Sequence, residues 1–496
     1  MPSIADRIFR GDKNVNIPGG TPLTPTIFLI VLVLAVALLV YTTIKLKIHP
    51  VISLFVIAVI LGLVLGGSLG DTMDKINKYF GSTLAGIAIV IIFGAIIAMG
   101  IQDTGAATKI TNFFIRIFRG KHLELAPSSA AFVMTLAVFG NISEVLTAPI
   151  SAIIAKRKKI TMALIAPLVC LGLTLTHGLV PTHPGILAVS IMFKANIGKV
   201  MVWGIIISFI AFVASYLISR PFLGREYIAP NPEFAAGYEE APENAPLDQL
   251  YIKEEGTPST FWSFMPLIVP LVLIAAGSLG TLGVKKGSTA YAVFNSLGNT
   301  TFALFVGVVL VALLVVGRKN KVLASARKSD ASLSDKSSAL EITMNSWVGR
   351  AMKTAIDPLI MIGMGGALGG ILQDNAMVKQ LGAMIVNLSV PAVIIPFVLA
   401  AVMMGATGSM TIAVMISASL VNPMMGALGL SPVVATLAIG CGSMVFWHVN
   451  CSGFWMMTSL FNLNTKQGLK YLTTLNALGG IIGFAVLCGA SALGWV

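Results

Sequence analysis

Charged residues are scarce in this chain of 496 residues. They make up 11% of it, 56% of the residues are apolar, and the mean hydropathy is +0.90. Soluble globular domains carry about 25% charged residues, so this composition excludes the soluble class. Apolar runs long enough to cross about 30 Å of hydrocarbon recur along the chain. The sequence therefore predicts an all-α polytopic membrane protein.

Cysteines are also few. Cys170, Cys441, Cys451 and Cys488 all lie in apolar segments, without the spacing of metal ligands or of a disulfide framework. An HExxH metalloprotease motif is absent from the sequence. The net charge of +13 comes from short basic clusters between apolar runs, which favours orientation in a lipid bilayer over a nucleic-acid partner. We therefore expect that the protein is not an enzyme, that it has no catalytic residue, and that it binds no metal and no cofactor.

Two glycine-rich segments ending in Gln-Asp suggest an internal repeat: Gly94–Asp103 and Gly365–Asp374. Each is followed by a polar glycine segment and then, about 37 or 38 residues later, by a polar stretch with histidine. These pairs are Gly140–Ser143 with Gly405–Ser409, and His177–Gly185 with Ser443–Gly453. Broken apolar segments at equivalent places in two halves are typical of secondary transporters.

The chain accordingly divides into two inverted repeats. We expect a first repeat over 1–222, a cytoplasmic linker over 223–262 with eight acidic and two basic residues, and a second repeat over 263–496 with a cytoplasmic loop at 318–346. Each repeat has a re-entrant hairpin, at about 127–155 and 391–422, and a broken helix, at about 161–193 and 432–462. Non-helical backbone at membrane depth needs protein or a wet cavity around it.

Basic residues set the expected orientation. The first hairpin exits into Lys156–Lys159, whereas the second exits through Val421–Pro432, which carries no charge. Because basic loops stay on the cytoplasmic side, the two hairpins open on opposite sides, as inverted repeats require. The N- and C-termini are then expected outside.

Ionisable residues inside a bilayer are costly and are functional candidates by default. Glu144 lies in the first hairpin, where it could carry a proton or pair with a cation elsewhere in the protein. His177 and His448 lie at the two breaks and are further candidates for proton coupling, because imidazole titrates near neutrality. A structural role for each histidine is the alternative.

Hydroxyl and amide groups gather at the hairpin tips and helix breaks. Next to helix N-termini such groups favour a carboxylate ligand, although they could instead only cap the broken helices. The expected substrate-binding residues are Asn141, Ser143, Thr182, His183, Thr407, Ser409, Thr411, Asn450 and Ser452.

Two motifs resemble those of the gluconate:proton symporter (GntP) family. They are His177-Gly-Leu-Val-Pro-Thr-His-Pro-Gly-Ile186 and Trp447-His-Val-Asn-Cys-Ser-Gly-Phe-Trp455. The resemblance extends over most of both halves and includes Glu144-Val145 and Gly408–Ala413 in the hairpins. In the family pattern Cys451 is an aspartate, Thr182 and Ile186 are prolines, and Trp447 is a serine.

The resemblance implies a homodimer of the ion-transporter superfamily that works by an elevator motion. We expect a secondary active importer of a small organic carboxylate in a bacterial inner membrane, coupled to protons. Its substrate would be a sugar acid such as gluconate, a hydroxy acid or an amino acid such as D-serine, since the loss of the family aspartate puts gluconate itself in doubt. The alternative is a sodium-coupled carboxylate carrier or a cation/proton antiporter of the same architecture.

Overall fold

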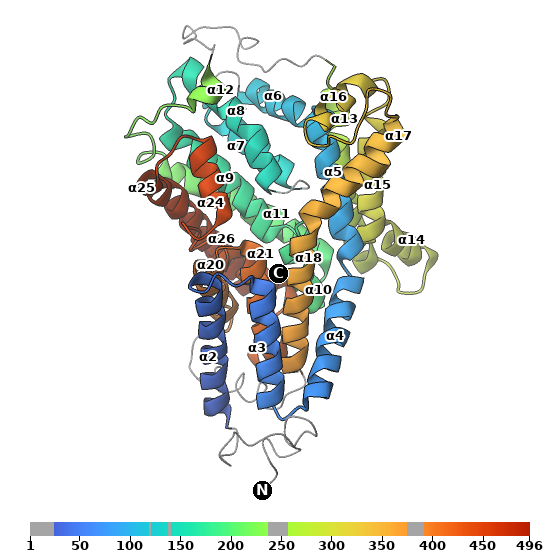
Figure 1. The fold of residues 1–496 in the computed structure, drawn as a ribbon, viewed down its shortest axis with the longest axis vertical. Helices are drawn as coiled ribbons and strands as arrows, with labels where there is room; N and C mark the ends of the chain where they lie inside the picture. Colours follow the sequence, from blue (N-terminus) through green and yellow to red (C-terminus); the bar gives the residue numbers. More distant parts are fainter. Residues whose placement is uncertain (1–23, 119–120, 137–139, 237–255, 374–390) are drawn as a thin grey trace.

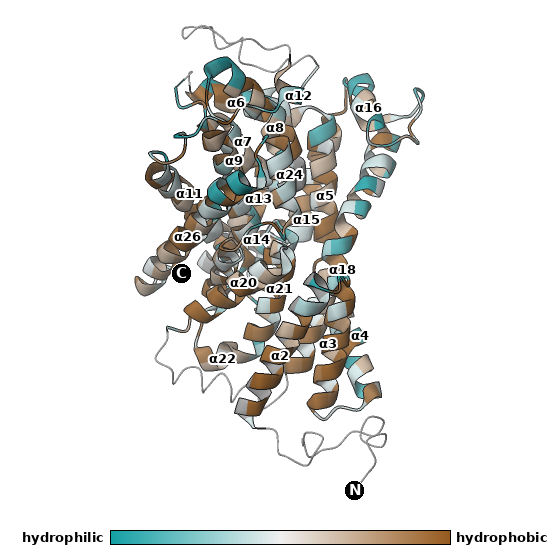
Figure 2. Cartoon of the chain, turned by 60° about the vertical axis from the view of Figure 1, so that its left-hand side comes forward, coloured by the Kyte–Doolittle hydropathy of each residue, from teal (hydrophilic) through white to brown (hydrophobic). Residues whose placement is uncertain are grey.

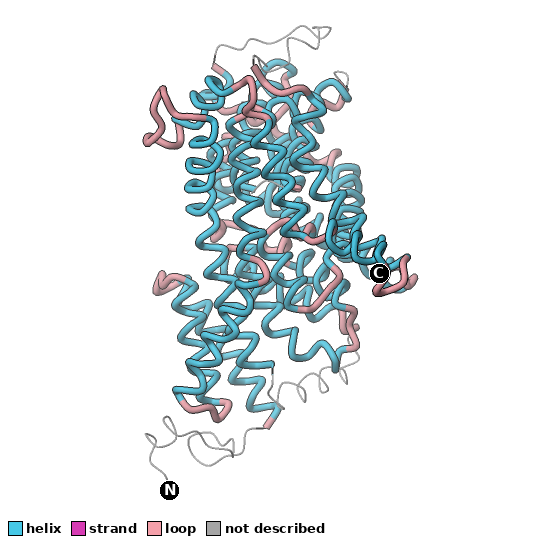
Figure 3. Tube along the Cα trace, turned by 90° about the vertical axis from the view of Figure 1, so that its right-hand side faces the viewer, coloured by secondary structure: helices cyan, strands magenta, loops and turns pink. Residues whose placement is uncertain are grey.

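The computed structural model describes residues 24–118, 121–136, 140–236, 256–373 and 391–496, and this part of the chain is helical, without β-strands (Figures 1 and 3). Within it, six helices are long and apolar enough to cross a membrane, or up to eight if each of two bent helix pairs is one span. Apolar residues run along most of the helices (Figure 2). The predicted all-helical class is confirmed.

The first helices run from the end of the molecule near the N-terminus, where α2, α3 and α4 lie, along α5 to α6 at the opposite end (Figure 1). They are α2 (Pro25–Ile44), α3 (Pro50–Val64), α4 (Leu69–Ala85), α5 (Ala88–Asp103) and α6 (Ala106–Phe118). Proline suits the first turn of α2 and of α3, because an N–H there would have no helical partner. The apolar run at 82–101 is not one straight helix, because the chain bends by 45° between α4 and α5.

The middle of the first half contains the predicted hairpin and broken helix. Its helices are α7 (Leu125–Thr135), α8 (Gly140–Lys158), α9 (Met162–Leu179), α10 (Pro184–Met192) and α11 (Ile197–Ser219). Helices α7 and α8 pack against each other and against α9. Between α9 and α10 the residues 180–183 leave the helix, and Pro184 starts the next one. Whether the α7–α8 pair is re-entrant stays a prediction.

The second half begins with helices that pack beside α5. They are α13 (Thr260–Gly283), α14 (Thr289–Leu297), α15 (Thr300–Leu313), α16 (Lys319–Arg327), α17 (Ala339–Glu341), the short π-helix η2 (Ile342–Ser346) and α18 (Trp347–Gln373). Helices α14 and α15 form the second bent pair, at 55°. The long α18 packs against α3, α4 and α5.

The last part of the chain, from residue 391, repeats the pattern of paired short helices. Its elements are α20 (Ile394–Thr407), α21 (Met410–Val421), η3 (Asn422–Met424), α22 (Met425–Leu428), α23 (Pro432–Gly442), α24 (Ser452–Leu460), α25 (Thr465–Gln467), η4 (Gly468–Thr473) and α26 (Thr474–Ala492). Contacts between the halves are reciprocal: α10 packs on α21, and α24 packs on α8.

A buried ion pair joins α5 to α18. Asp103 is 1% exposed and accepts a hydrogen bond from Trp347 Nε1 at 2.8 Å, and Arg350 pairs with the same carboxylate. Removing one partner of such a pair leaves a buried charge, which is strongly destabilising. Asp103 therefore fastens two helices together.

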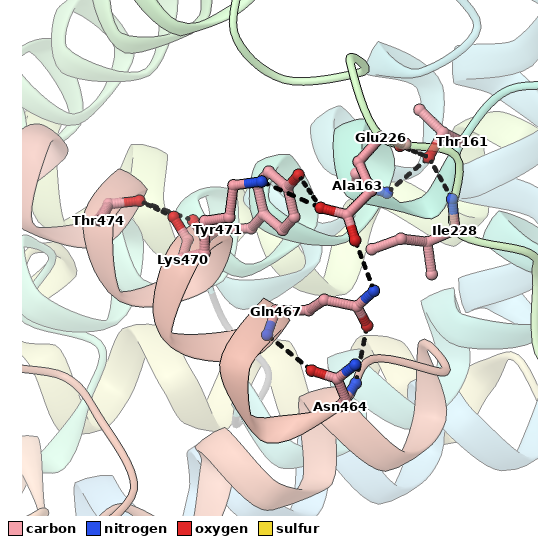
Figure 4. A network of polar contacts seen from close by, with 9 residues as sticks. All are labelled: Thr161, Ala163, Glu226, Ile228, Asn464, Gln467, Lys470, Tyr471 and Thr474. Atoms are coloured by element: carbon pink, nitrogen blue, oxygen red, sulfur yellow. Dashed lines mark hydrogen bonds and ion pairs between the residues drawn. The ribbon is translucent and has the colours of Figure 1, made fainter.

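A segment after α11, Glu226–Asn231, covers the far end of α24; we call it the strap. Thr161 Oγ1 donates to Glu226 O at 2.8 Å and accepts from Ile228 N at 2.9 Å. Figure 4 shows the Glu226 carboxylate receiving bonds from three side chains of the α25–η4 segment, namely Gln467, Lys470 and Tyr471. The short helix α12 (Pro232–Ala235) then follows and packs on α8.

Candidate functional site

The two predicted hairpin tips and the two helix breaks meet at one cavity of about 420 Å³. A volume of this size is typical of small-ligand sites. The lining residues from these four places are Gly140 and Glu144 of α8; Leu173, Thr174, His177 and Pro184 of α9 and α10; Gly408–Ile412; and Trp447 with Cys451–Gly453. Segments more than 300 residues apart thus share one wall.

A second wall of this central cavity comes from α3 and α18, and the sequence analysis missed it. Its residues are His49, Pro50, Thr354, Asp357, Pro358 and Met361. Since Pro358 has no N–H, it leaves the carbonyl of Thr354 without its helical donor. Asp357 adds a second carboxylate to the cavity, beside Glu144. An acidic residue followed by proline inside the apolar run 347–372 was the signal available for finding it.

Besides α3, which begins in the second wall, four helices of the tips and breaks begin at the central cavity: α8, α10, α21 and α24. The residues that precede α10 and α24, His183 and Cys451, make no side-chain cap bond. The first N–H groups of a helix lack partners within it, and the helix dipole is positive there. Four such ends around one space favour an anion.

The tip of the second hairpin is fixed against the break before α24. Asn450 Nδ2 donates to Gly405 O at 2.6 Å. Gly408 has φ +67°, and a Cβ built on it would lie 2.2 Å from the carbonyl oxygen of Asn450. Because only glycine tolerates this backbone and this approach, Gly408 allows the tip and the break to touch.

Of the twelve buried polar side-chain atoms without a partner in the described part of the chain, five lie at three of these places, namely the first tip and the two breaks. Among the described residues, Ser143 Oγ, Glu144 Oε2, Thr182 Oγ1, His183 Nε2 and Asn450 Oδ1 lack hydrogen-bond partners. Each unsatisfied buried group costs about 1–3 kcal/mol, so their clustering calls for a ligand or water. Within the same described ranges, no group of three or more His, Cys, Asp and Glu side chains could hold a metal ion.

The expected site residues fall into three sets. Glu144, His177, Ser409, Thr411 and Ser452 line the central cavity. Ser143, Thr182, His183, Thr407, Asn450 and His448 belong to the same tips and breaks but stand outside its lining. The side chain of Asn141 lies outside the described part of the structure.

One ring contact ties the outer set to the lining: the rings of His177 and His183 stack with centroids 4.5 Å apart. Within the lining, a Cβ built on Gly453 would lie 3.6 Å from Cys451 Sγ and 3.7 Å from Glu144 Oε1. Glu144 of the first half therefore meets the second break at the position where the family pattern has an aspartate.

The chain is similar to known permeases over most of its length. A model of the GntP family permeases matches residues 27–493. The Gnt-II system L-idonate transporter of Escherichia coli is 26% identical over 94% of this chain and 99% of its own length. A high-affinity gluconate transporter of the same organism is 27% identical over 92% and 99%, and the gluconate permease of Bacillus licheniformis is 27% identical over 92% and 98%.

Two solved structures share the fold. The YdaH transporter of Alcanivorax borkumensis superposes with a TM-score of 0.59 at 14% identity, over 90% of this chain and 98% of that one. MtrF of Neisseria gonorrhoeae, from a study of antimetabolite efflux pumps, gives a TM-score of 0.54 at 14% identity over 85% of each chain. At this identity the likeness concerns the fold alone.

Proposed function

The chain belongs to the GntP family of permeases, and from that premise we propose that it imports a small organic carboxylate, a sugar acid, by secondary active transport. It is a multi-pass membrane transporter and not an enzyme. The membrane would be a bacterial inner membrane, with two copies of the chain forming a homodimer.

The convergence of four helix N-termini on one 420 Å³ cavity carries the proposal. A carboxylate accepts hydrogen bonds from free N–H groups and is attracted by the positive helix ends. Ser409, Thr411 and Ser452 add hydroxyl donors beside them.

The sugar-acid class is inferred from the names of the relatives and from the second wall. A sugar acid has a carboxylate at one end and a row of hydroxyls along the rest. The carboxylate would face the helix N-termini, while the hydroxyls would donate to Asp357 and to the freed carbonyl of Thr354. A substrate hydroxyl would also give a partner to Glu144 Oε2, a buried atom without one whose residue lines the cavity.

Coupling to protons is assigned to Glu144, with His177 and His448 in support. Glu144 is 6% exposed and faces the cavity, and one of its carboxylate oxygens has no partner among the described residues. A buried carboxylate without a cation beside it favours the protonated form, which suits a site loaded with one proton per cycle.

The motion would be of the elevator type. The hairpins α7–α8 and α20–α21, the broken helices α9–α10 and α23–α24, and helices α11 and α26 would move together against α3, α4, α5, α13, α15 and α18. The reciprocal packing of α10 on α21 and of α24 on α8 supports this grouping, and it supports two inverted repeats as its origin.

Uptake by proteoliposomes tests the proposal. One proton moving with one monovalent anion transfers no net charge, so a pH gradient should drive gluconate uptake and a membrane potential alone should not. Glu144→Gln should lose the pH dependence but keep counterflow exchange. Uptake driven by a membrane potential or by sodium would point to the sodium-coupled carrier instead. If the protein shows no saturable uptake of gluconate under any of these gradients, the proposal that it transports sugar acids is refuted.

A further inference from the structure

A second cavity, of about 380 Å³, lies at the far end of α10. Its polar lining consists of the Lys194 ammonium, the hydroxyls of Tyr79, Ser82 and Thr83, and the Asn422 amide. No acidic side chain is among the described residues that line it, whereas the central cavity holds Glu144 and Asp357. A cavity with one cation, several hydrogen-bond donors and no anion favours an anionic ligand.

The two cavities lie along the same two helices. Helix α10 begins with Pro184 at the central cavity, and its last residues, Ile191 and Met192, line the second one. Helix α18 lines the central cavity with Thr354–Met361 and the second with Gly366–Gly370. At 1.5 Å per residue, the nine residues of α10 separate the cavities by roughly 13 Å.

Lys194 changes the charge at this end of α10. The C-terminus of a helix is the negative end of its dipole and repels an anion. Lys194 follows α10 with φ +55°, is exposed, and lines the cavity, so its ammonium offsets that negative end. An anion then meets positive charge at both ends of α10.

We propose that the second cavity is a low-affinity binding site for carboxylate anions, which the substrate occupies on its way between bulk water and the central cavity. Lys194 attracts the carboxylate, and the hydroxyls and the Asn422 amide form hydrogen bonds with the hydroxyl groups of the substrate. The assignment rests on the proposed transport of sugar acids.

Cysteine modification tests the site without any transport. Ser82 is exposed and lines the cavity, so Ser82→Cys is to be treated with an anionic and a cationic methanethiosulfonate reagent, with the parent and its four native cysteines as the baseline. Adding Lys194→Gln should lower the ratio of anionic to cationic rates by about fivefold at low ionic strength. Lys199→Gln is the matched control, because Lys199 is exposed nearby but does not line the cavity.

Gluconate is the probe for occupancy. At millimolar concentration it should slow modification of Ser82→Cys, and Lys194→Gln should weaken this protection while Lys199→Gln should not. In transport, Lys194→Gln should raise the apparent KM by roughly two- to fivefold with an unchanged maximal rate, and the effect should vanish in high salt.

Two results overturn the assignment: equal rate ratios in the Lys194→Gln and Lys199→Gln variants, or no protection by gluconate. A failure of the proposed function is recognised separately. In that case the wild-type protein takes up no sugar acid under any gradient, whereas the charge selectivity at Ser82→Cys is read from protein in detergent and does not depend on uptake.

Discussion

Helices α10 and α24 begin and end alike, but their far ends have different neighbours. Each has nine residues, starts at the central cavity, and follows a residue that makes no side-chain cap bond. Each is followed, two residues after its end, by a side-chain-bearing residue with positive φ: Lys194 at +55° and Asn462 at +58°. The two half-helices are therefore matched in length and in the turn that ends them.

Their far ends have different neighbours. Beyond α10 lies the second cavity, whereas the strap covers the end of α24. Asn231 Nδ2 donates to the carbonyls of Ser459 and Leu460, and Asn462 Nδ2 donates to Ala229 O at 3.1 Å. The two half-helices thus present similar starts to the binding site, while different segments pack at their far ends.

A disulfide that joins α18 to α21 near the second cavity should have the largest effect on uptake. A Cβ built on Gly369 would lie 3.4 Å from Ser419 Cβ, so Gly369→Cys with Ser419→Cys should form a disulfide between α18 and α21. Because the proposed motion carries α21 past α18, oxidation should reduce uptake to below about a tenth, and reductant should restore it. Gluconate uptake before and after reduction is the measurement.

A disulfide within the moving group is the control for that lock. Gly483→Cys and Ala211→Cys bring Cβ atoms to 3.9 Å between α26 and α11, in a parent with Cys441→Ala to avoid mispairing. Uptake should persist in this oxidised variant. If the α18–α21 disulfide forms and uptake also persists, the proposed division between the two groups is wrong.

A substitution at the second hairpin tip should have the next largest effect on transport. Gly408→Ala places a Cβ against the Asn450 carbonyl, so it should separate the tip from the break and raise the apparent KM by about tenfold. Gly429 also has positive φ, +61°, but no atom within 4 Å of a built Cβ, so Gly429→Ala should cost only backbone strain of about 1 kcal/mol. Equal KM values in the two variants would contradict the tip's role.

Removing the strap's bonds to the end of α24 should have a smaller effect. Asn231→Ala removes the side-chain bonds to the last turn of α24 and should lower the free energy of unfolding by about 1 kcal/mol. Lys194→Gln, after the end of α10, should leave the thermal midpoint unchanged. A thermal-shift comparison of the two variants decides, and equal midpoints would show that the strap does not stabilise α24.

Acid should destabilise the strap. Hydrogen bonds from Tyr471, and then from Gln467 and Lys470, lower the pKa of Glu226 to about 2. A carboxylate with a depressed pKa contributes stability above its unfolded value, about 4.5, and loses that contribution as pH falls toward 2. Glu226→Gln should therefore flatten the loss of stability between pH 4.5 and 2 and leave the thermal midpoint at pH 8 lower than that of the parent.

The sequence predicted the helices well because hydropathy records burial in lipid directly. Glycine, proline and polar residues inside apolar runs marked the tips and breaks, and the structure brings those four places to one cavity. The binding and coupling roles of these residues stay predictions, as do re-entry, inverted orientation and the homodimer.

Two features escaped the sequence analysis for a common reason. Asp357 lies within α18 and Lys194 in the turn after α10, and what distinguishes them is the cavity that each lines. The proline after Asp357 was a local signal, but the position of each cavity depends on packing between distant segments, such as α10 against α18. The bend between α4 and α5 was missed similarly, because the apolar run continues through it.

Pro358 gives α18 a backbone acceptor that could select for substrates with a hydroxyl group. The carbonyl it releases has no protonation state and no rotamer, so it would recognise a substrate hydroxyl identically at every pH. Replacing this proline by alanine would return the oxygen to the helix ladder and remove that acceptor from the cavity.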